Sequence, residues 1–207
     1  MKLGFFTMPV HPVDKDWRLS LKEDREAFLL ADELGFTEAY VGEHVTDRAE
    51  NITSCIAFIA WLAAATRQIK LGTGTVNMPN AHPAAVAASI AMLDHMLDGR
   101  LIFGISPGGL LSDAEVFGNL EADRNAMFLE AINQVLQLWT TQPPYDIKGQ
   151  FWNLSTARTY IPELLDDVLA GRINPGRVFD SVMQLEDAAE AYKAMDERRA
   201  FKVLLRP

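Results

Sequence analysis

A strand followed by a helix recurs four times before residue 140, and this rhythm limits the fold more than any other feature of the sequence. Short apolar segments at 2–8, 39–41, 69–75 and 101–105 predict strands, and segments at about 20–35, 53–66, 84–97 and 123–139 predict helices. Ser20 with Glu23 fits a capping box at the start of the first helix, and Gly35 fits its end. Short connections between such units imply a parallel sheet with right-handed crossovers.

The fold class that follows is α/β, a partial (half) TIM-type barrel with four parallel strands. A complete barrel of this type needs about 250 residues, and the rhythm stops at about half of its eight units. After residue 140 the sequence changes character, with turn signals at Pro143-Pro144 and Gly149. We therefore expect a half barrel at 1–142, a hairpin or linker at 143–159, and an appendage of helices and a short terminal strand at 160–207.

Composition excludes several classes of partner. The net charge is −9 and the pI about 4.9, which disfavours nucleic acid and anionic membranes. The single cysteine, Cys55, lies in an apolar run and is interpreted as a core residue. The histidines show no metal-ligand spacing, so no metal is expected. Neither a signal peptide nor a membrane-spanning run is recognisable, and a cytoplasmic location is the expectation.

Four segments, in order and spacing, resemble the bacterial luciferase-like family of flavin-dependent monooxygenases. They are GFFTMP at 4–9, VGEH at 41–44, LGTGTV at 71–76 with His82-Pro83, and DGRLIFGI at 98–105. The resemblance covers about residues 1–155. It implies an oxidoreductase in which reduced flavin and oxygen act on a small organic substrate. The implied cofactor is FMN, with a deazaflavin of the F420 type as the alternative.

The last part of the chain resembles the extreme C-terminus of zinc-type alcohol dehydrogenases. The matching segments are IPELL at 161–165, GRINP at 171–175, LEDAAEAY at 185–192 and KVLLRP at 202–207. That family's dinucleotide fingerprint and zinc ligands are not recognisable in this sequence. We therefore expect the tail to supply a packing element rather than dehydrogenase chemistry, as part of a fusion.

Barrel enzymes place their sites at the carboxyl ends of the strands. His44, which follows the second predicted strand, matches a histidine that the resemblance implies acts in acid/base steps. An imidazole with an ordinary pKa near 6.5 suits proton transfer at neutral pH. The alternative is a strand-end histidine that bonds to neighbouring backbone.

The same edge is expected to carry the flavin. The candidate cofactor-binding residues are Met8, Glu43, Gly74, Thr75, Ser106 and Gly108, with Asn77 and Pro107 on the same face. Glycines permit close backbone approach to a flat ring. The resemblance implies a cis peptide bond between Gly74 and Thr75. Ser106 and Pro107 depart from the luciferases, which carry cysteine and arginine there. Glu43 is equally compatible with a structural salt bridge.

Two functions remain open. Phosphate sites of barrels usually follow strands seven and eight, which this sequence does not supply. The alternative to an active monooxygenase is therefore a catalytically inactive, truncated or fused barrel that acts as a flavin-binding or dimerising scaffold.

Small residues line the second and third predicted helices. In the resembled family these helices form a dimer interface, so we expect a homodimer, with burial inside one chain as the alternative. The expected contact residues are Ile56, Ile59, Ala60 and Ala63 on the second helix and Ala84, Ala87, Ala88 and Ala91 on the third.

Overall fold

The chain folds as two separate units, residues 1–156 and 157–207. A computed structural model describes residues 2–156 and 160–207. The predicted hairpin segment at 143–159 belongs to the first unit up to residue 156, and its last three residues lie outside the described part. Each unit is described by itself below.

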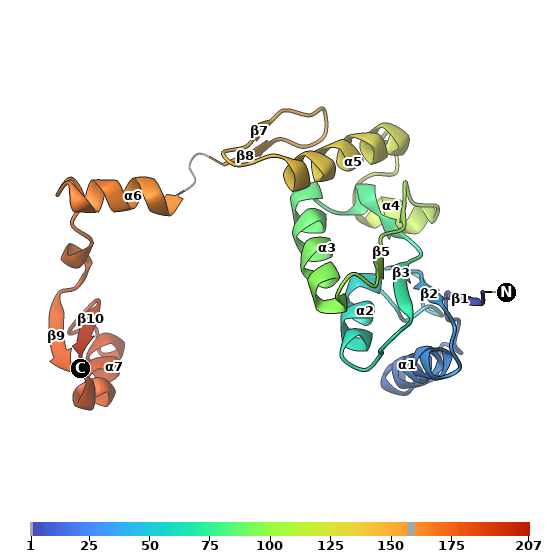
Figure 1. Ribbon diagram of the computed structural model, residues 1–207, viewed down its shortest axis with the longest axis horizontal. Coiled ribbons are helices and arrows are strands. Elements are labelled where there is room, and N and C mark those ends of the chain that lie inside the picture. The colour runs from blue at the N-terminus through green and yellow to red at the C-terminus, as the bar shows by residue number, and fades with distance from the viewer. Residues whose placement is uncertain (1, 157–159) are drawn as a thin grey trace. The chain divides into compact units, whose positions relative to one another are not determined.

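The first unit is built on a four-stranded parallel sheet, which confirms the predicted fold class (Figure 1). Its strands are β1 (Gly4–Thr7), β2 (Glu38–Val41), β3 (Lys70–Thr73) and β5 (Leu101–Ile102), in the order β1-β2-β3-β5. Two short continuations, β4 (Val76–Asn77) and β6 (Ile105–Ser106), also pair in parallel. The third and fourth predicted strands are thus each divided in two.

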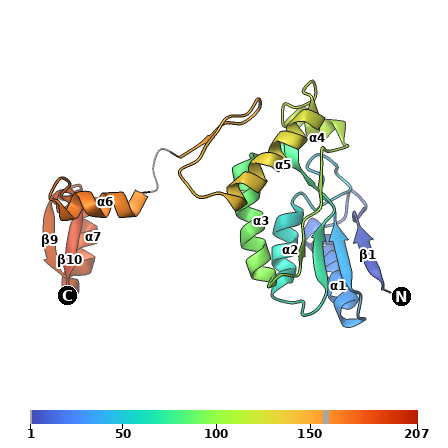
Figure 2. The ribbon, with the colours of Figure 1, turned by 45° about the horizontal axis from the view of Figure 1, so that its top comes forward.

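Helices follow the strands as the rhythm predicts. They are α1 (Trp17–Glu33), α2 (Cys55–Ala63), α3 (Pro83–Leu97) and α5 (Arg124–Thr140), with a 3-10 turn, η1 (Met78–Asn80). Figure 2 shows α2 and α3 on one face of the strands. A further short helix, α4 (Leu111–Val116), was not predicted.

The start of the first helix was wrongly predicted. Asp16 is the N-cap and its carboxylate accepts from Arg18 N, so the helix begins one turn earlier than the Ser20–Glu23 pattern indicated. Ser20 is instead buried inside the helix, where its hydroxyl donates to Asp16 O. The end was correct, since Gly35 follows the helix with a φ of +79°.

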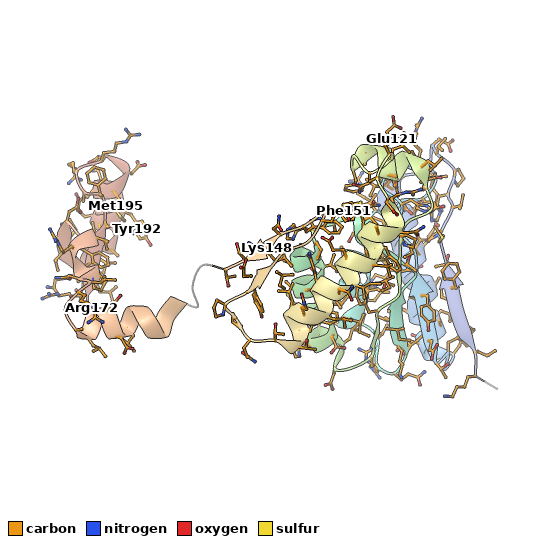
Figure 3. The ribbon with its side chains drawn as sticks, turned by 90° about the horizontal axis from the view of Figure 1, so that it is seen from above. Glu121, Lys148, Phe151, Arg172, Tyr192 and Met195 are labelled. Carbon is orange, nitrogen blue, oxygen red and sulfur yellow. The ribbon has the colours of Figure 1, made fainter. Side chains whose placement is uncertain are left out.

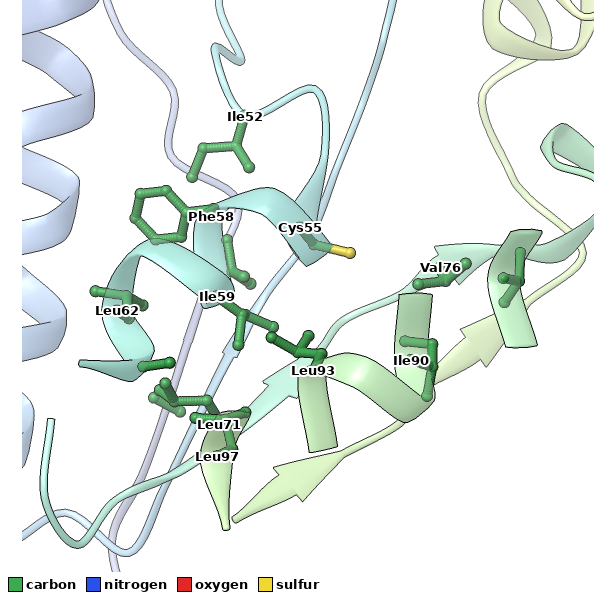
Figure 4. Packing of buried hydrophobic residues seen from close by; sticks show 14 of the residues in the cluster. Ile52, Cys55, Phe58, Ile59, Leu62, Leu71, Val76, Ile90, Leu93 and Leu97 are labelled. Atoms are coloured by element: carbon green, nitrogen blue, oxygen red, sulfur yellow. The ribbon is translucent and has the colours of Figure 1, made fainter. Parts of the chain in front are cut away.

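The core lies between the sheet and the helices because alternate strand residues point to that side. Ala39, Val41 and Leu71 are fully buried there. Leu71 packs with residues of α2 and α3 that Figure 4 shows, among them Ile59 and Leu93. The opposite face of the sheet, which the helices do not cover, carries Phe6, Tyr40 and Gly72 at paired positions. Phe6 is 60% exposed.

A hairpin closes the first unit. Its strands β7 (Asp146–Ile147) and β8 (Leu154–Ser155) pair antiparallel. The side chains of Lys148 and Phe151 in this segment are labelled in Figure 3.

The second unit ends in a strand-helix-strand arrangement. It contains α6 (Tyr160–Leu169), η2 (Pro175–Val178), β9 (Ser181–Gln184), η3 (Leu185–Asp187), α7 (Ala188–Asp196) and β10 (Val203–Arg206). β9 and β10 pair in parallel, and α7 packs on them with Ala191 and Ala194 buried. The predicted helix at 185–199 is shorter than expected, and β9 was not predicted.

Within the described ranges, no helix has both the length and the apolar composition needed to cross a bilayer.

Candidate functional site

His44 lies three residues beyond the end of β2, at the carboxyl edge of the sheet. Its backbone N donates to Ile52 O at 3.2 Å. The ring atom Nδ1 lies 2.7 Å from Glu50 Oε2, and both side chains are mostly buried. Nδ1 is enclosed by protein and has no aligned hydrogen bond, so its short contact with Glu50 is an ion pair only when the imidazole ring is protonated. Nε2 forms no hydrogen bond within the described residues, and the side chain is 20% exposed.

A buried carboxylate holds the loop that follows His44. Asp113, in α4, is 2% exposed. Its Oδ1 accepts from Thr46 N at 2.9 Å and from Thr46 Oγ1 at 2.6 Å, and its Oδ2 is 3.3 Å from Val45 N. Such bonds to a charged acceptor are strong and need the carboxylate in one position. Sequence reasoning missed both Asp113 and Glu50, because the contacts join residues that no local pattern connects.

The Glu43 side chain contacts the start of α2, whereas the His44 side chain contacts Glu50. Its Oε2 accepts from Cys55 N at 2.9 Å, which satisfies a free N–H in the first turn of α2. Ser54 is the N-cap of the same helix. Burial raises the pKa of the Cys55 thiol far above its ordinary range, and the neighbouring Glu43 carboxylate adds to this shift. Cys55 is therefore a core thiol, as predicted, and Glu43 serves the helix.

A network of hydroxyl and amide groups joins the third and fourth strand ends. The Gly74–Thr75 peptide bond is cis, as the resemblance implied. Thr75 Oγ1 donates to Ser106 Oγ at 2.8 Å, and Ser106 Oγ donates to Asn77 Oδ1 at 2.8 Å. Gly108 N donates to Ser106 Oγ at 3.1 Å. The pairing of β4 with β6 places Asn77 opposite Ser106 and so brings these groups together.

Three further candidates, Met8, Gly74 and Gly108, lie where space or backbone conformation favours glycine. Met8 packs against Gly42, where an added Cβ would lie 2.6 Å from Met8 Cγ. Gly108 has a φ of +83°, a left-handed conformation that favours glycine. Gly74 also packs closely, because a Cβ there would lie 3.0 Å from a ring carbon of Phe6. The structure thus gathers Thr75, Ser106 and Gly108 in one network, while Met8, Glu43 and His44 keep separate contacts.

The residues present fit the ring of a flavin. The open sheet face carries aromatic rings, with Phe6 exposed and the Tyr40 ring lying over Gly72. At its edge the Thr75 hydroxyl oxygen keeps acceptor capacity for a flavin N–H, while Ser106 Oγ and Gly108 N are already paired within the network and hold that hydroxyl in place. A metal centre has no comparable support, since no group of three or more His, Cys, Asp or Glu side chains gathers in the described ranges.

This arrangement defines a half of a flavin-type (β/α) barrel. The family model described as luciferase-like monooxygenase matches residues 1–168, and the chain belongs to that family. The match runs into the predicted tail at 160–207. These comparisons give no support to an alcohol dehydrogenase origin for that tail.

Individual relatives agree with the family. The 4-hydroxyprotoasukamycin monooxygenase of Streptomyces nodosus subsp. asukaensis is 35% identical over 158 residues, which cover 76% of this chain and 43% of that protein. Limonene 1,2-monooxygenase of Rhodococcus erythropolis is 33% identical over 185 residues, with 84% and 48% covered.

A solved structure shows the same fold. The oxygenating constituent of 3,6-diketocamphane monooxygenase from Pseudomonas putida, in complex with FMN, has a TM-score of 0.73 at 25% identity. The similarity covers 79% of this chain and 46% of that one. The chain therefore spans about half the length of the relatives it matches.

Proposed function

We propose that this chain acts in a flavin-dependent monooxygenase reaction, in which reduced flavin and oxygen oxidise a small organic substrate. The observation that carries the proposal is the shared carboxyl edge, where the Thr75–Ser106–Gly108 network and the unpaired Nε2 of His44 follow neighbouring parallel strands. FMN is the cofactor we favour, because a structural relative binds it. A deazaflavin is the alternative.

The flavin supplies the redox chemistry when bound, and the protein positions it and moves protons. The Thr75 hydroxyl oxygen would accept from its polar edge, and the Ser106 and Gly108 groups would hold that hydroxyl in position. His44 Nε2 would accept or donate a proton, while the Glu50 carboxylate at Nδ1 balances the positive charge of the protonated ring.

We also propose a homodimer through α2 and α3, on a surface that differs from the predicted residues. Ile59, Ala63 and Ala87 are buried in this chain's own core, as the alternative foresaw for them. The exposed large apolar residues of these helices are Trp61, Met92 and Met96, at 45%, 66% and 45% exposure, and of the predicted residues Ala88 is exposed. Exposed apolar residues on both helices, with no charged side chain between residues 51 and 66, suit self-association.

A second function has an observation in its favour. Phe6 is exposed on a sheet face that no helix of the first unit covers. A catalytically silent, flavin-binding or dimerising scaffold would need this face without needing His44.

Titration of the purified chain with FMN, followed by visible absorbance, tests the first step. Saturable binding in the micromolar range supports the proposal, and no binding of FMN or deazaflavin contradicts it. Oxygen uptake with reduced FMN and a panel of small cyclic and linear substrates tests the second step. His44→Gln is expected to bind flavin normally and to lose most turnover, while His95→Gln, on the exposed side of α3, keeps it. Equal turnover in His44→Gln would reject the acid/base role of His44, whereas flavin binding without turnover in the wild type would favour the scaffold.

A further inference from the structure

A cavity of about 230 Å³ is lined by α1, by the loop that precedes α2 and by α2 itself. Among the described residues that line it, none belongs to the Thr75–Ser106–Gly108 network and none is Glu43 or His44. An apolar cavity of roughly 150 Å³ is large enough to hold a benzene molecule. This cavity therefore has room for one aromatic ring with a small polar group, at a place separate from the proposed flavin edge.

Two aromatic side chains form part of its wall. Phe58 and Trp61 meet edge to face, with their ring centroids 6.2 Å apart. Phe58 is 5% exposed, and the Arg25 guanidinium lies 4.9 Å from the centre of the Trp61 ring, which helps to hold that ring in place. The remaining apolar lining comes from Leu21, Ile52 and Ala57. Such walls favour a flat aromatic body, because ring contacts add to the free energy of apolar burial.

One buried amide in the lining has no partner. Asn51 lines the cavity and is only 5% exposed. Its Nδ2 and Oδ1 are both enclosed, and neither forms a hydrogen bond with a residue in the ranges 2–156 and 160–207. Buried polar groups are nearly always paired, so an unpaired amide requires a reason. The amide presents a donor and an acceptor side by side, and its complement is a group that also presents both, a carbonyl oxygen next to an N–H.

The other polar groups of the lining do not select a charged ligand. Ser54 Oγ accepts from Ala57 N at 3.2 Å as the N-cap of α2, and Thr53 is exposed. The lining contains no charged side chain among the residues that the structure describes. A carboxylate or an ammonium group would lose hydration there without meeting an opposite charge. The ligand is therefore expected to be neutral.

We propose that this cavity binds a small neutral aromatic carboxamide, with its ring against Phe58 and Trp61 and its amide paired with Asn51 through two hydrogen bonds. The carbonyl oxygen of the ligand accepts from Asn51 Nδ2, and the N–H of the ligand donates to Asn51 Oδ1. The proposal does not rest on the monooxygenase function, because the site shares no residue with the flavin edge. It also gives a reason for Asn51, whose unpaired amide destabilises the folded protein when no ligand is bound.

Titration of the flavin-free protein with benzamide, followed by nitrogen-15 NMR, tests the proposal. We expect saturable shifts of the Asn51 side-chain amide and of the Trp61 indole N–H, while the Trp139 indole, which donates to Ala87 O, stays in place. Acetophenone carries a methyl group where benzamide has its amide nitrogen, and it should bind about tenfold more weakly because Asn51 Oδ1 stays unpaired. Benzoate should cause no shift at the same concentration, since it is charged and has no N–H.

Two variants separate a ligand site from a structural role. Asn51→Leu is expected to weaken benzamide binding at least about tenfold and yet to melt at or above the wild-type temperature, because it removes two unpaired polar groups. Ala57→Leu, at an exposed lining position, is expected to weaken binding to a similar extent by filling the cavity. Ala64→Leu, exposed at the C-cap of the same helix, is the matched control and should bind as the wild type does.

Trp61 also belongs to the surface proposed for the homodimer, so sedimentation is measured on the same samples. Absence of benzamide shifts overturns the proposal whether the chain is a monomer or a dimer. It is also overturned if acetophenone or benzoate binds as tightly as benzamide, or if Asn51→Leu and Ala57→Leu both bind as the wild type does. A lower melting temperature for Asn51→Leu would assign Asn51 a structural role and reject its pairing with a ligand.

Discussion

Glu130 Oε1 accepts a hydrogen bond from Trp152 N at 2.8 Å, which ties the middle of α5 to the hairpin segment. The same carboxylate also accepts from Phe151 N at 3.0 Å and from Gln150 N at 2.7 Å. Three successive backbone N–H groups thus surround one side chain. The hairpin's short strands offer little pairing of their own, so this carboxylate fixes its base.

Replacing Glu130 is therefore expected to release the hairpin. Glu130→Ala should lower the free energy of unfolding by about 1–2 kcal/mol, because hydrogen bonds from partly exposed backbone N–H groups to a charged acceptor are lost. Urea denaturation measures this change, and amide exchange at residues 150–152 locates it. Glu121→Ala, at an exposed glutamate, is the control. Unchanged exchange at 150–152 would show that the carboxylate does not hold the segment.

Asp113 is expected to position His44 rather than only to stabilise the fold. Asp113→Asn keeps the shape but weakens the bonds to Val45 N and Thr46 N. The imidazole NMR signals of His44 should shift or broaden, while those of His95 stay in place. Glu115→Gln, exposed in the same helix, should leave all of them unchanged. A uniform effect on every histidine would indicate general destabilisation instead.

Asp32 gives the fold a pH dependence of known sign. Burial raises the pKa of this carboxyl, but backbone N–H groups of Ile69, Arg67 and Gln68 outweigh burial and hold the pKa below its ordinary value. The folded-state pKa is below the unfolded one, so the stabilisation is present above about pH 4 and is lost as pH falls through the folded-state pKa. Unfolding of wild type and Asp32→Asn should differ at neutral pH and converge in acid. A constant difference at all pH values would contradict this assignment.

Gly104 is required by a close backbone approach. A Cβ at this position would lie 2.1 Å from Thr73 O, an atom that cannot move without separating the two strands. Gly104→Ala is expected to cost about 2 kcal/mol or more, as overpacking does. Thermal unfolding measures the loss, with Gly109→Ala as the control because its Cβ meets open space. Equal melting temperatures for the two variants would refute the steric argument.

Much of the fold could be predicted because its signals are local. The apolar strand at 2–8 and the glycine at position 35 each act within a few residues. The interruption of the third and fourth strands could not be predicted, since it depends on the pairing of Asn77 with Ser106 across 29 positions. The short helix α4 carries no strong pattern and was missed.

The site divides in the same way. Thr75, Ser106 and Gly108 could be named from the resemblance, but their hydrogen bonds to one another needed the structure. Glu50 and Asp113 are charged residues in polar segments, and nothing in their immediate neighbours distinguishes them from solvent-exposed acids. Their burial against the His44 loop is a property of the tertiary fold alone.

Because Glu43 and His44 are consecutive, substitutions in the core under α2 can affect the position of the His44 side chain. Glu43 anchors the first turn of α2 and His44 is the proposed acid/base, so a repacked α2 is expected to tilt the imidazole through a single peptide unit. Core substitutions beneath that helix should therefore change the rate of proton transfer at His44 before they lower the stability of the fold.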